Sequence, residues 1–191
     1  MVVLGAVFFA GSVSAQTAPA NQLGSRGEPG ANLRYERLSN TRFEHAPEEN
    51  PFDWALDVPA SLELTRKDGL QLRFQGAENL DLSHLHQHAL VSPGRYRFSA
   101  EIQATGLSTD QGPYFRIVDG VDDKRLEMET PQIHGDVARS WITTEFNVGQ
   151  GTEVVDVQLR RNPSLRFDNL IAGSLHVFAV SLSAIKVESA K

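Results

Sequence analysis

The first group of chemistry-bearing residues in this chain is a run of histidines. His84, His86 and His88 are spaced by two, so an extended strand places all three imidazoles on one side. Imidazole is a common ligand of zinc and copper. Neighbouring same-face side chains on one strand lie ~7 Å apart, so three of them cannot bind one ion without distortion of the backbone. We therefore predict no metal site in this run.

The second group combines aromatic rings with planar polar side chains, as sugar recognition requires. A ring packs against the apolar C–H side of a pyranose, and amides or guanidinium groups hydrogen-bond its hydroxyls. Tyr114 and Arg116 are two residues apart, so a strand points both to the same face. We predict a solvent-facing pair, against the alternative that Arg116 only covers Tyr114. The full set of predicted ligand-binding residues is Tyr114, Arg116, Trp54, Gln103, Gln158 and Arg160.

The third group is a set of carboxylates within residues 119–129. Its members are Asp119, Asp122, Asp123, Glu127 and Glu129. A glycosidase needs two carboxyl groups ~5 to 9.5 Å apart across a cleft, whereas an acidic run at a glycine-containing turn is typical of a solvated loop. Gly24-Ser25-Arg26-Gly27 lies in a spacer and is no nucleophile elbow. We therefore predict that the protein has no catalytic site.

Short alternating segments are the elements that must position these side chains. Residues 70–75 and 96–102 alternate apolar and polar side chains most clearly. Further strands are expected at 114–118, 125–128, 141–148, 154–160 and 175–187. The last segment changes phase between Val177 and Phe178, as a β-bulge requires. Since no long window keeps a helical apolar stripe, the pattern predicts an all-β fold, a jelly-roll β-sandwich.

Composition and charge limit the classes of partner. The chain has 191 residues, of which 40% are hydrophobic and 22% charged, enough for one buried core. Its net charge of −6 argues against nucleic acid or an anionic membrane as a partner, because both would repel an acidic surface. The chain contains no cysteine, so its stability must come from the core.

The N-terminal segment has the pattern of a secretory signal. An apolar run at residues 2–10 is followed by small residues up to Ala15, and it is shorter than the ~20 residues that span a bilayer. We expect a signal peptide at 1–15, a flexible spacer at 16–32 and a β-sandwich domain at 33–189. The expected protein is exported, periplasmic or extracellular, with no membrane span after signal cleavage.

Three motifs in order along the chain resemble those of a known family. Residues 38–44 are similar to the family's opening L-x-N-x-x-F-E, residues 87–100 to its Q-x-V-x-L-x-P-G-x-Y-x-L-S-A, and residues 141–148 to its W-x-x-x-x-F-x-V. The chain thus resembles carbohydrate-binding modules of the galactose-binding-like jelly-roll class, as appended to xylanases and glucanases. A narrower resemblance, carried by residues 51–54 (Pro-Phe-Asp-Trp), is to sandwich modules of bacterial exopolysaccharide-system proteins.

The resemblance implies a non-catalytic module that binds a polysaccharide or oligosaccharide. Two alternatives stay open: a docking or assembly module with a protein partner in a bacterial envelope or exopolysaccharide apparatus, and a glycoside hydrolase or polysaccharide lyase on the same fold. Many such modules hold structural calcium through the opening glutamate, here Glu44, and a C-terminal aspartate. Residues 178–182 contain no carboxylate, so we expect no cofactor. Trp141 is interpreted as a core or edge anchor, with ligand stacking as the alternative.

The signal-peptide interpretation predicts the N-terminus of the exported protein. Because the small residues before Gln16 suit a signal peptidase, mass spectrometry of the secreted form is expected to find a chain that begins at Gln16. An intact N-terminus at Met1 in that form would contradict the interpretation.

Overall fold

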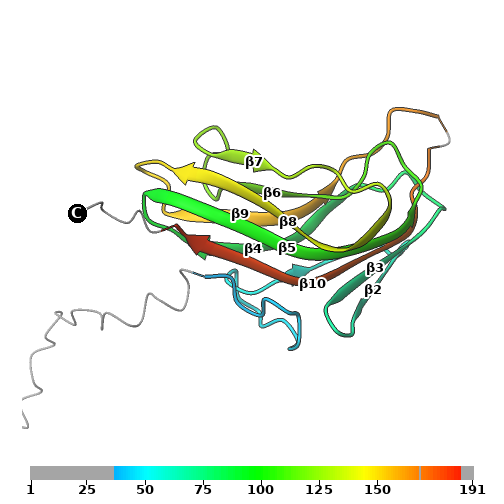
Figure 1. Cartoon of the computed structure of the whole chain (residues 1–191), viewed down its shortest axis with the longest axis horizontal. Helices are drawn as coiled ribbons and strands as arrows, with labels where there is room; N and C mark the ends of the chain where they lie inside the picture. The colour runs from blue at the N-terminus through cyan, green and yellow to red at the C-terminus, as the bar shows by residue number, and fades with distance from the viewer. Residues whose placement is uncertain (1–36, 168, 186–191) are drawn as a thin grey trace, which may run out of the picture.

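Two packed β-sheets make up the described part of the chain (Figure 1). The computed structural model describes residues 37–167 and 169–185, in which no helix is present. The predicted signal peptide (1–15) and spacer (16–32) lie outside these residues. The described residues contain no helix that is long and apolar enough to cross a membrane.

Each sheet has five antiparallel strands, and the chain crosses repeatedly from one sheet to the other. The β4–β9 sheet is formed, in spatial order, by β1 (Ala55–Leu56), β4 (Leu82–Leu90), β9 (Val154–Arg161), β6 (Tyr114–Asp119) and β7 (Glu127–Glu129). The β5–β10 sheet is formed by β2 (Leu62–Arg66), β3 (Leu70–Gln75), β10 (Ala172–Ala184), β5 (Gly94–Leu107) and β8 (Gly135–Val148). The connections β4–β5, β5–β6, β8–β9 and β9–β10 all change sheet, which gives the predicted jelly-roll sandwich.

The core lies between the sheets and follows the alternation of the strands. Phe98 on β5 is 0% exposed, and its ring centroid lies 5.0 Å from that of Phe115 on β6, in the opposite sheet. The same buried core contains the inward-facing side chains of Ala100, Ile102, Ile117, Val157 and Leu159. Since successive side chains point to opposite faces, the residues between these positions face outward on both sheets.

The structure confirms each predicted strand but shifts the bounds of most of them, and it extends β8 at its start by six residues. The register of β10 against β5 shifts between Val177 and Ala179, which confirms the predicted bulge. Strand β8 begins at Gly135 rather than at Trp141, so Trp141 lies well inside the strand. The predicted strands did not include β1 and β2, which contain two and five residues, or the nine-residue β4.

A buried arginine joins two loops to the end of β9. Arg161 points inward and is fully buried, and burial lowers the pKa of its guanidinium group. Its Nε donates to the Gln111 carbonyl at 3.0 Å, and its Nη1 donates to the Leu80 carbonyl. Its Nη2 donates to Asn79 Oδ1 and Thr109 Oγ1, both at 3.3 Å. These charge-assisted hydrogen bonds thus give partners to the guanidinium group of Arg161, the one charged side chain of β9 that points inward.

The position of Phe98 predicts a large loss of stability on truncation. Phe98→Ala is expected to cost about 3 to 5 kcal/mol, because it leaves a cavity where the two sheets meet. Thr105→Ala, at an exposed position of the same strand, is the control and should change stability by about 0.5 kcal/mol or less. Urea unfolding measures both, and equal midpoints for the two variants would mean that the register of β5 is wrong.

Candidate functional site

The six predicted ligand-binding residues lie in three separate places. Trp54 is 2% exposed and packs in the core, with its ring centroid 5.1 Å from that of Phe43. Gln103 lies on the outer face of the β5–β10 sheet. The other four lie on the outer face of the β4–β9 sheet. The prediction of Trp54 as a sugar-stacking ring is therefore wrong, because its indole is shielded from solvent.

The four residues on the β4–β9 sheet are neighbours, but Tyr114 is not accessible. Tyr114 stands opposite Arg160 in the strand register, and Arg116 stands opposite Gln158. Tyr114 is 3% exposed, and its hydroxyl accepts a 3.0 Å hydrogen bond from Asn162 Nδ2. The predicted solvent-facing Tyr114–Arg116 pair is therefore wrong, because the ring of Tyr114 is shielded from solvent.

Arg116 is engaged by the acidic stretch that follows it. Its Nη2 and Nε donate to Glu127 Oε1 at 2.6 and 2.9 Å, and Asp123 Oδ2 lies 3.4 Å from Nη2. Burial opposes the charge, yet these carboxylates raise the pKa of Arg116 overall. Glu129 Oε1 lies 3.9 Å from Nε. Arg116 thus fastens β7 and its loop to β6.

Asp119 has a structural role at the end of β6. Its Oδ2 accepts a 2.6 Å hydrogen bond from the Thr152 hydroxyl, and its Oδ1 accepts from the backbone N–H groups of Val121 and Asp122. The hydrogen bond from Thr152, followed by those from the backbone, lowers the pKa of Asp119 against the opposing effect of burial. This carboxylate holds a turn, as expected for an acidic run at a glycine.

Trp141 is an accessible aromatic ring, for which the sequence indicated ligand stacking only as the alternative. It is 55% exposed and stands opposite Glu101 on the outer face of the β5–β10 sheet. Its interpretation as a core anchor is wrong, although it does lie on the edge strand β8. The phase of the strand was the available signal: Phe146 and Val148 point inward, so every odd-numbered neighbour back to Trp141 points outward.

Polar and aromatic side chains extend from Trp141 across two further strands. Arg139 Nε and Nη2 donate to the Glu101 carboxylate at 2.8 and 3.0 Å, and the guanidinium carbon lies 3.8 Å from the Phe178 ring centroid. The His176 ring lies 3.7 Å from that of Phe178. Six residues share this surface of β8, β5 and β10, which we call the Trp141 face: Trp141, Arg139, Glu101, Gln103, His176 and Phe178.

A pocket of about 580 Å³ borders the Trp141 face. Arg139, His176 and Phe178 form its floor. The turn between β2 and β3 forms one wall and lies against β10 at Gly69, where φ is +122° and a Cβ would collide with the Val177 carbonyl. His176 Nε2 donates a 3.0 Å hydrogen bond to the Asp68 carbonyl of that turn. The volume is in the range of small-ligand pockets, ~300 to 1,000 Å³.

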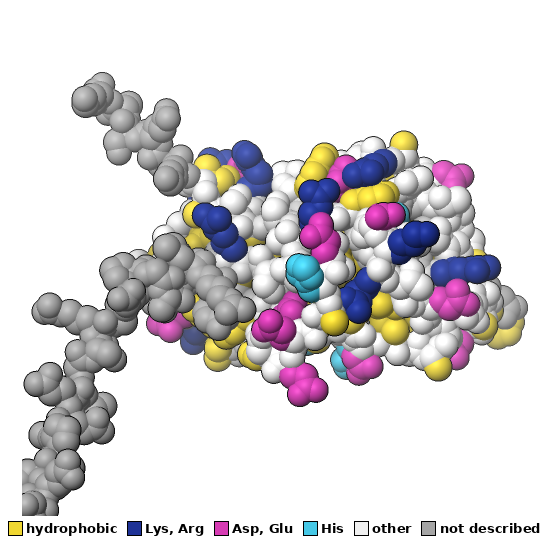
Figure 2. Space-filling model, turned by 90° about the horizontal axis from the view of Figure 1, so that it is seen from below, with side chains coloured by type: hydrophobic (Ala, Val, Ile, Leu, Met, Phe, Trp, Pro, Cys, Tyr) yellow, Lys and Arg dark blue, Asp and Glu magenta, His cyan; other side chains and the backbone are white. Residues whose placement is uncertain are grey.

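The charges around this pocket are balanced. Its lining contributes three arginines and two carboxylates, and Glu101 adds a third carboxylate through its pair with Arg139. The hydrogen bond from Arg139 lowers the pKa of Glu101. In the view from below, side chains of both signs are interspersed over the surface with small apolar spots between them (Figure 2). The surface near the pocket therefore has no dominant sign of charge.

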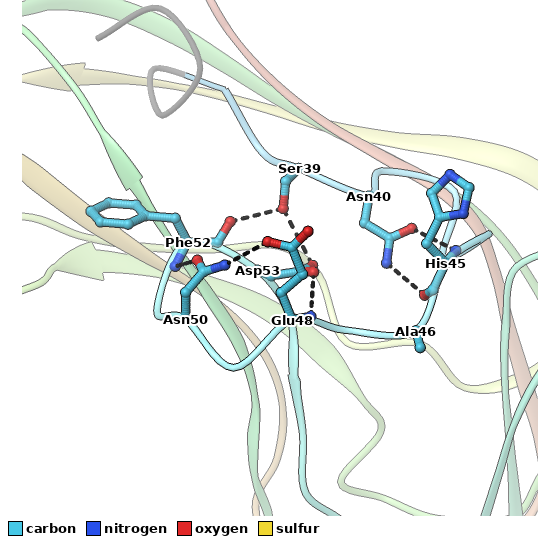
Figure 3. Close-up of a pocket in the computed structure, with 8 residues that line it drawn as sticks. All are labelled: Ser39, Asn40, His45, Ala46, Glu48, Asn50, Phe52 and Asp53. Carbon is cyan, nitrogen blue, oxygen red and sulfur yellow. Dashed lines mark hydrogen bonds between the residues drawn. The ribbon is translucent and has the colours of Figure 1, made fainter. Parts of the chain in front are cut away.

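A smaller polar pocket of about 230 Å³ is built around Asp53 (Figure 3). The Asp53 carboxylate accepts hydrogen bonds from the backbone N–H groups of Glu48 and Trp54, at 2.8 and 2.7 Å, and from the Ser39 hydroxyl at 3.3 Å. Gln87 Nε2 donates to Ser39 Oγ at 2.6 Å. Pro51-Phe52-Asp53-Trp54 is thus a folding motif, because its carboxylate fixes the loop that leads into β1.

The burial of Tyr114 predicts how two variants will differ. Tyr114→Ala is expected to lower stability by about 3 kcal/mol or more, as for other buried aromatic rings. Tyr114→Phe should cost about 1 kcal/mol, because it removes only the hydrogen bond from Asn162. Thermal and urea unfolding measure both variants. An unchanged midpoint in Tyr114→Ala would show that the ring is exposed after all.

Comparison with known proteins gives structural neighbours only. The chain matches no family model and no curated protein. Among solved structures, it is similar to TmCBM61 in complex with beta-1,4-galactotriose (13% identity, TM-score 0.48, 78% of this chain and 97% of that chain). It is also similar to a CBM4 structure (17% identity, TM-score 0.48, 78% of this chain and 99% of that chain). A further similar structure is BiXyn10A CBM1 (11% identity, TM-score 0.45, 76% of this chain and 99% of that chain). These neighbours are carbohydrate-binding modules, the class that the sequence motifs resemble.

Proposed function

We propose that this protein is a non-catalytic carbohydrate-binding module that binds a neutral polysaccharide or oligosaccharide on the Trp141 face. The observation that carries the proposal is the half-exposed indole of Trp141 on a sheet face that bears planar polar groups. An exposed indole costs solvation free energy, because its apolar surface is in water. A pyranose that stacks on it removes that surface from water without unfolding any element.

The neighbours of Trp141 suit the hydroxyls of a bound sugar. Gln103 contributes an amide, and the Glu101–Arg139 pair presents a carboxylate and a guanidinium group already held in place by two hydrogen bonds. Groups with fixed orientation lose less conformational entropy when they bind. The sheet itself is rigid, since β5 pairs with β8 on one side and with β10 on the other.

Charge balance supports a neutral glycan. Arg139 pairs with Glu101, and on the same face Arg95 and Arg97 share the carboxylate of Glu145, each with a contact of 2.6 Å. These five side chains leave one net positive charge, which creates little field to attract an acidic polymer, and the whole chain carries −6. Export, with Gln16 as the first residue of the mature chain, would place such a module where polysaccharides occur.

A protein-docking role is the rival of a different class. Leu165 and Phe167, in the loop between β9 and β10, are almost completely exposed. Two apolar side chains at one loop tip suit a contact with a protein partner of an envelope or exopolysaccharide apparatus. The two proposals use different residues, so variants can separate them.

Removal of the Trp141 ring tests the glycan proposal. A glycan array with the full chain selects the ligand, and isothermal titration with that oligosaccharide then measures affinity. Trp141→Ala is expected to weaken binding by about 1 to 3 kcal/mol, judging by the stacking of aromatic side chains on nucleobases. That corresponds to a rise in Kd of roughly 5- to 150-fold.

Phe167→Ala is the matched control, because it removes an exposed aromatic ring that is not one of the six residues of the Trp141 face. Its Kd should equal that of the wild type, and circular dichroism should show all three proteins folded. Equal affinity of Trp141→Ala and the wild type would refute the site. Failure of the wild type to bind any glycan on the array would refute the function and favour protein docking.

A further inference from the structure

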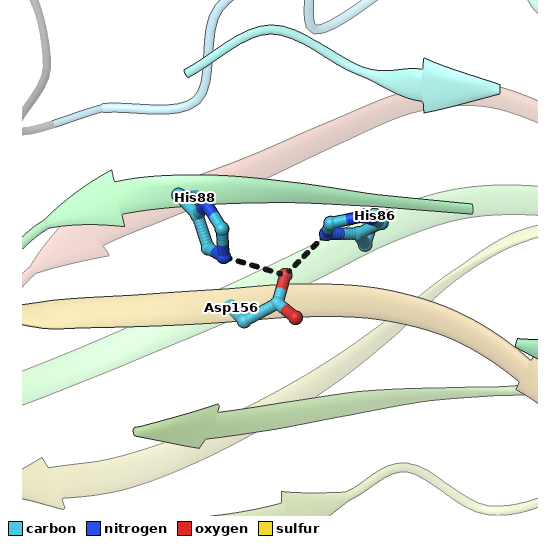
Figure 4. Close-up of side chains that lie close together, drawn as sticks. All are labelled: His86, His88 and Asp156. Carbon is cyan, nitrogen blue, oxygen red and sulfur yellow. Dashed lines mark hydrogen bonds and ion pairs between the residues drawn. The ribbon is translucent and has the colours of Figure 1, made fainter. Parts of the chain in front are cut away.

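Two of the three histidines of β4 meet a carboxylate from the neighbouring strand (Figure 4). His86 Nδ1 lies 3.0 Å from Asp156 Oδ1, and His88 Nε2 lies 3.9 Å from the same oxygen. The ring centroids of His86 and His88 are 5.5 Å apart. One nitrogen from each histidine and one Asp156 oxygen lie within 4.8 Å of one another.

Strand register explains why this group is tighter than the histidine run alone. Side chains two apart on one strand are ~7 Å apart, but directly opposite residues on paired strands have Cβ atoms ~4.5 to 5.5 Å apart. His88 stands directly opposite Asp156, and His86 stands opposite Gln158, one outward position further along. The carboxylate therefore reaches between the two rings. His84 is exposed beside a register shift in β4 and is not part of the group.

We propose that His86, His88 and Asp156 form a binding site for one divalent transition-metal ion of the zinc, nickel or copper class. Such an ion takes His nitrogen and carboxylate oxygen at ~2.0 to 2.2 Å, and ligand atoms around it lie roughly 3 to 4 Å apart, so small side-chain rotations suffice here. Two imidazoles with one carboxylate suit these ions, whereas calcium needs six to eight oxygens.

The surroundings of the three residues support a built site. Gln158 Nε2 donates a 2.7 Å hydrogen bond to Asp156 Oδ2, which leaves Oδ1 turned toward the histidines and fixes the carboxylate as outer-shell partners do. The backbone N–H of His88 donates to the Pro51 carbonyl at 2.9 Å, and β1 pairs with β4 at His86. The His86 and His88 side chains are 33% and 28% exposed, which gives water access to a fourth coordination position.

The test is a metal titration of the full chain without a histidine tag. Competition between the protein and a chromogenic chelator for Zn²⁺ gives the affinity and stoichiometry. The wild type is expected to bind one Zn²⁺ per chain with a micromolar or lower Kd. His88→Ala and Asp156→Asn should each raise the Kd by roughly tenfold or more, since each leaves only two ligands.

His84→Ala is the matched control, because it removes an exposed imidazole from the same strand and leaves the three ligands intact. Its Kd should stay within twofold of the wild type. Addition of Zn²⁺ should also raise the melting temperature of the wild type and of His84→Ala, but not that of His88→Ala. Absence of Zn²⁺, Ni²⁺ and Cu²⁺ binding to the wild type, or equal losses in His84→Ala and His88→Ala, would overturn the proposal.

Discussion

The contact between Phe98 and Phe115 joins the two sheets and sets what each outer face presents. Their ring centroids are 5.0 Å apart, and both side chains are buried. Because side chains alternate along a strand, the inward position of Phe98 means that Glu101 and Gln103 point outward. There they lie beside Trp141 of the paired strand. In the same way, the inward position of Phe115 means that Arg116 points outward, on the opposite face of the molecule. A slip of one residue would exchange core and surface on either strand.

Alternation in the sequence was enough to predict the sandwich and the bulge after Val177, because both depend on local pattern. It failed where exposure depends on neighbours in space. Tyr114 points to an outer face, yet its side chain is buried and its hydroxyl is hydrogen-bonded to Asn162 of the loop that follows β9. Trp141 was interpreted wrongly because the predicted strand began at Trp141, whereas β8 begins at Gly135. The partnership of Asp156 with His86 depends on the register between β4 and β9, which no single segment contains.

The two outer faces differ in how they use polar side chains. On the β4–β9 sheet, Arg116 and the acidic stretch secure the edge strand β7, while His86, His88 and Asp156 converge on one point. On the β5–β10 sheet, the Arg139–Glu101 ion pair is on the same face as an indole in contact with water. The first arrangement suits a small cation and the second suits an extended neutral polymer, so one sandwich can present two independent sites on opposite sides.

The most direct test of glycan binding on the Trp141 face uses the two tryptophans of the chain. Each gives one indole N–H signal in a ¹H–¹⁵N correlation spectrum, and Trp54 is a buried internal reference at 2% exposure against 55% for Trp141. Titration with the selected oligosaccharide is predicted to shift the Trp141 indole signal and leave that of Trp54 in place. Shifts confined to backbone amides of β4, β9 and β6, with the Trp141 indole unmoved, would contradict this account.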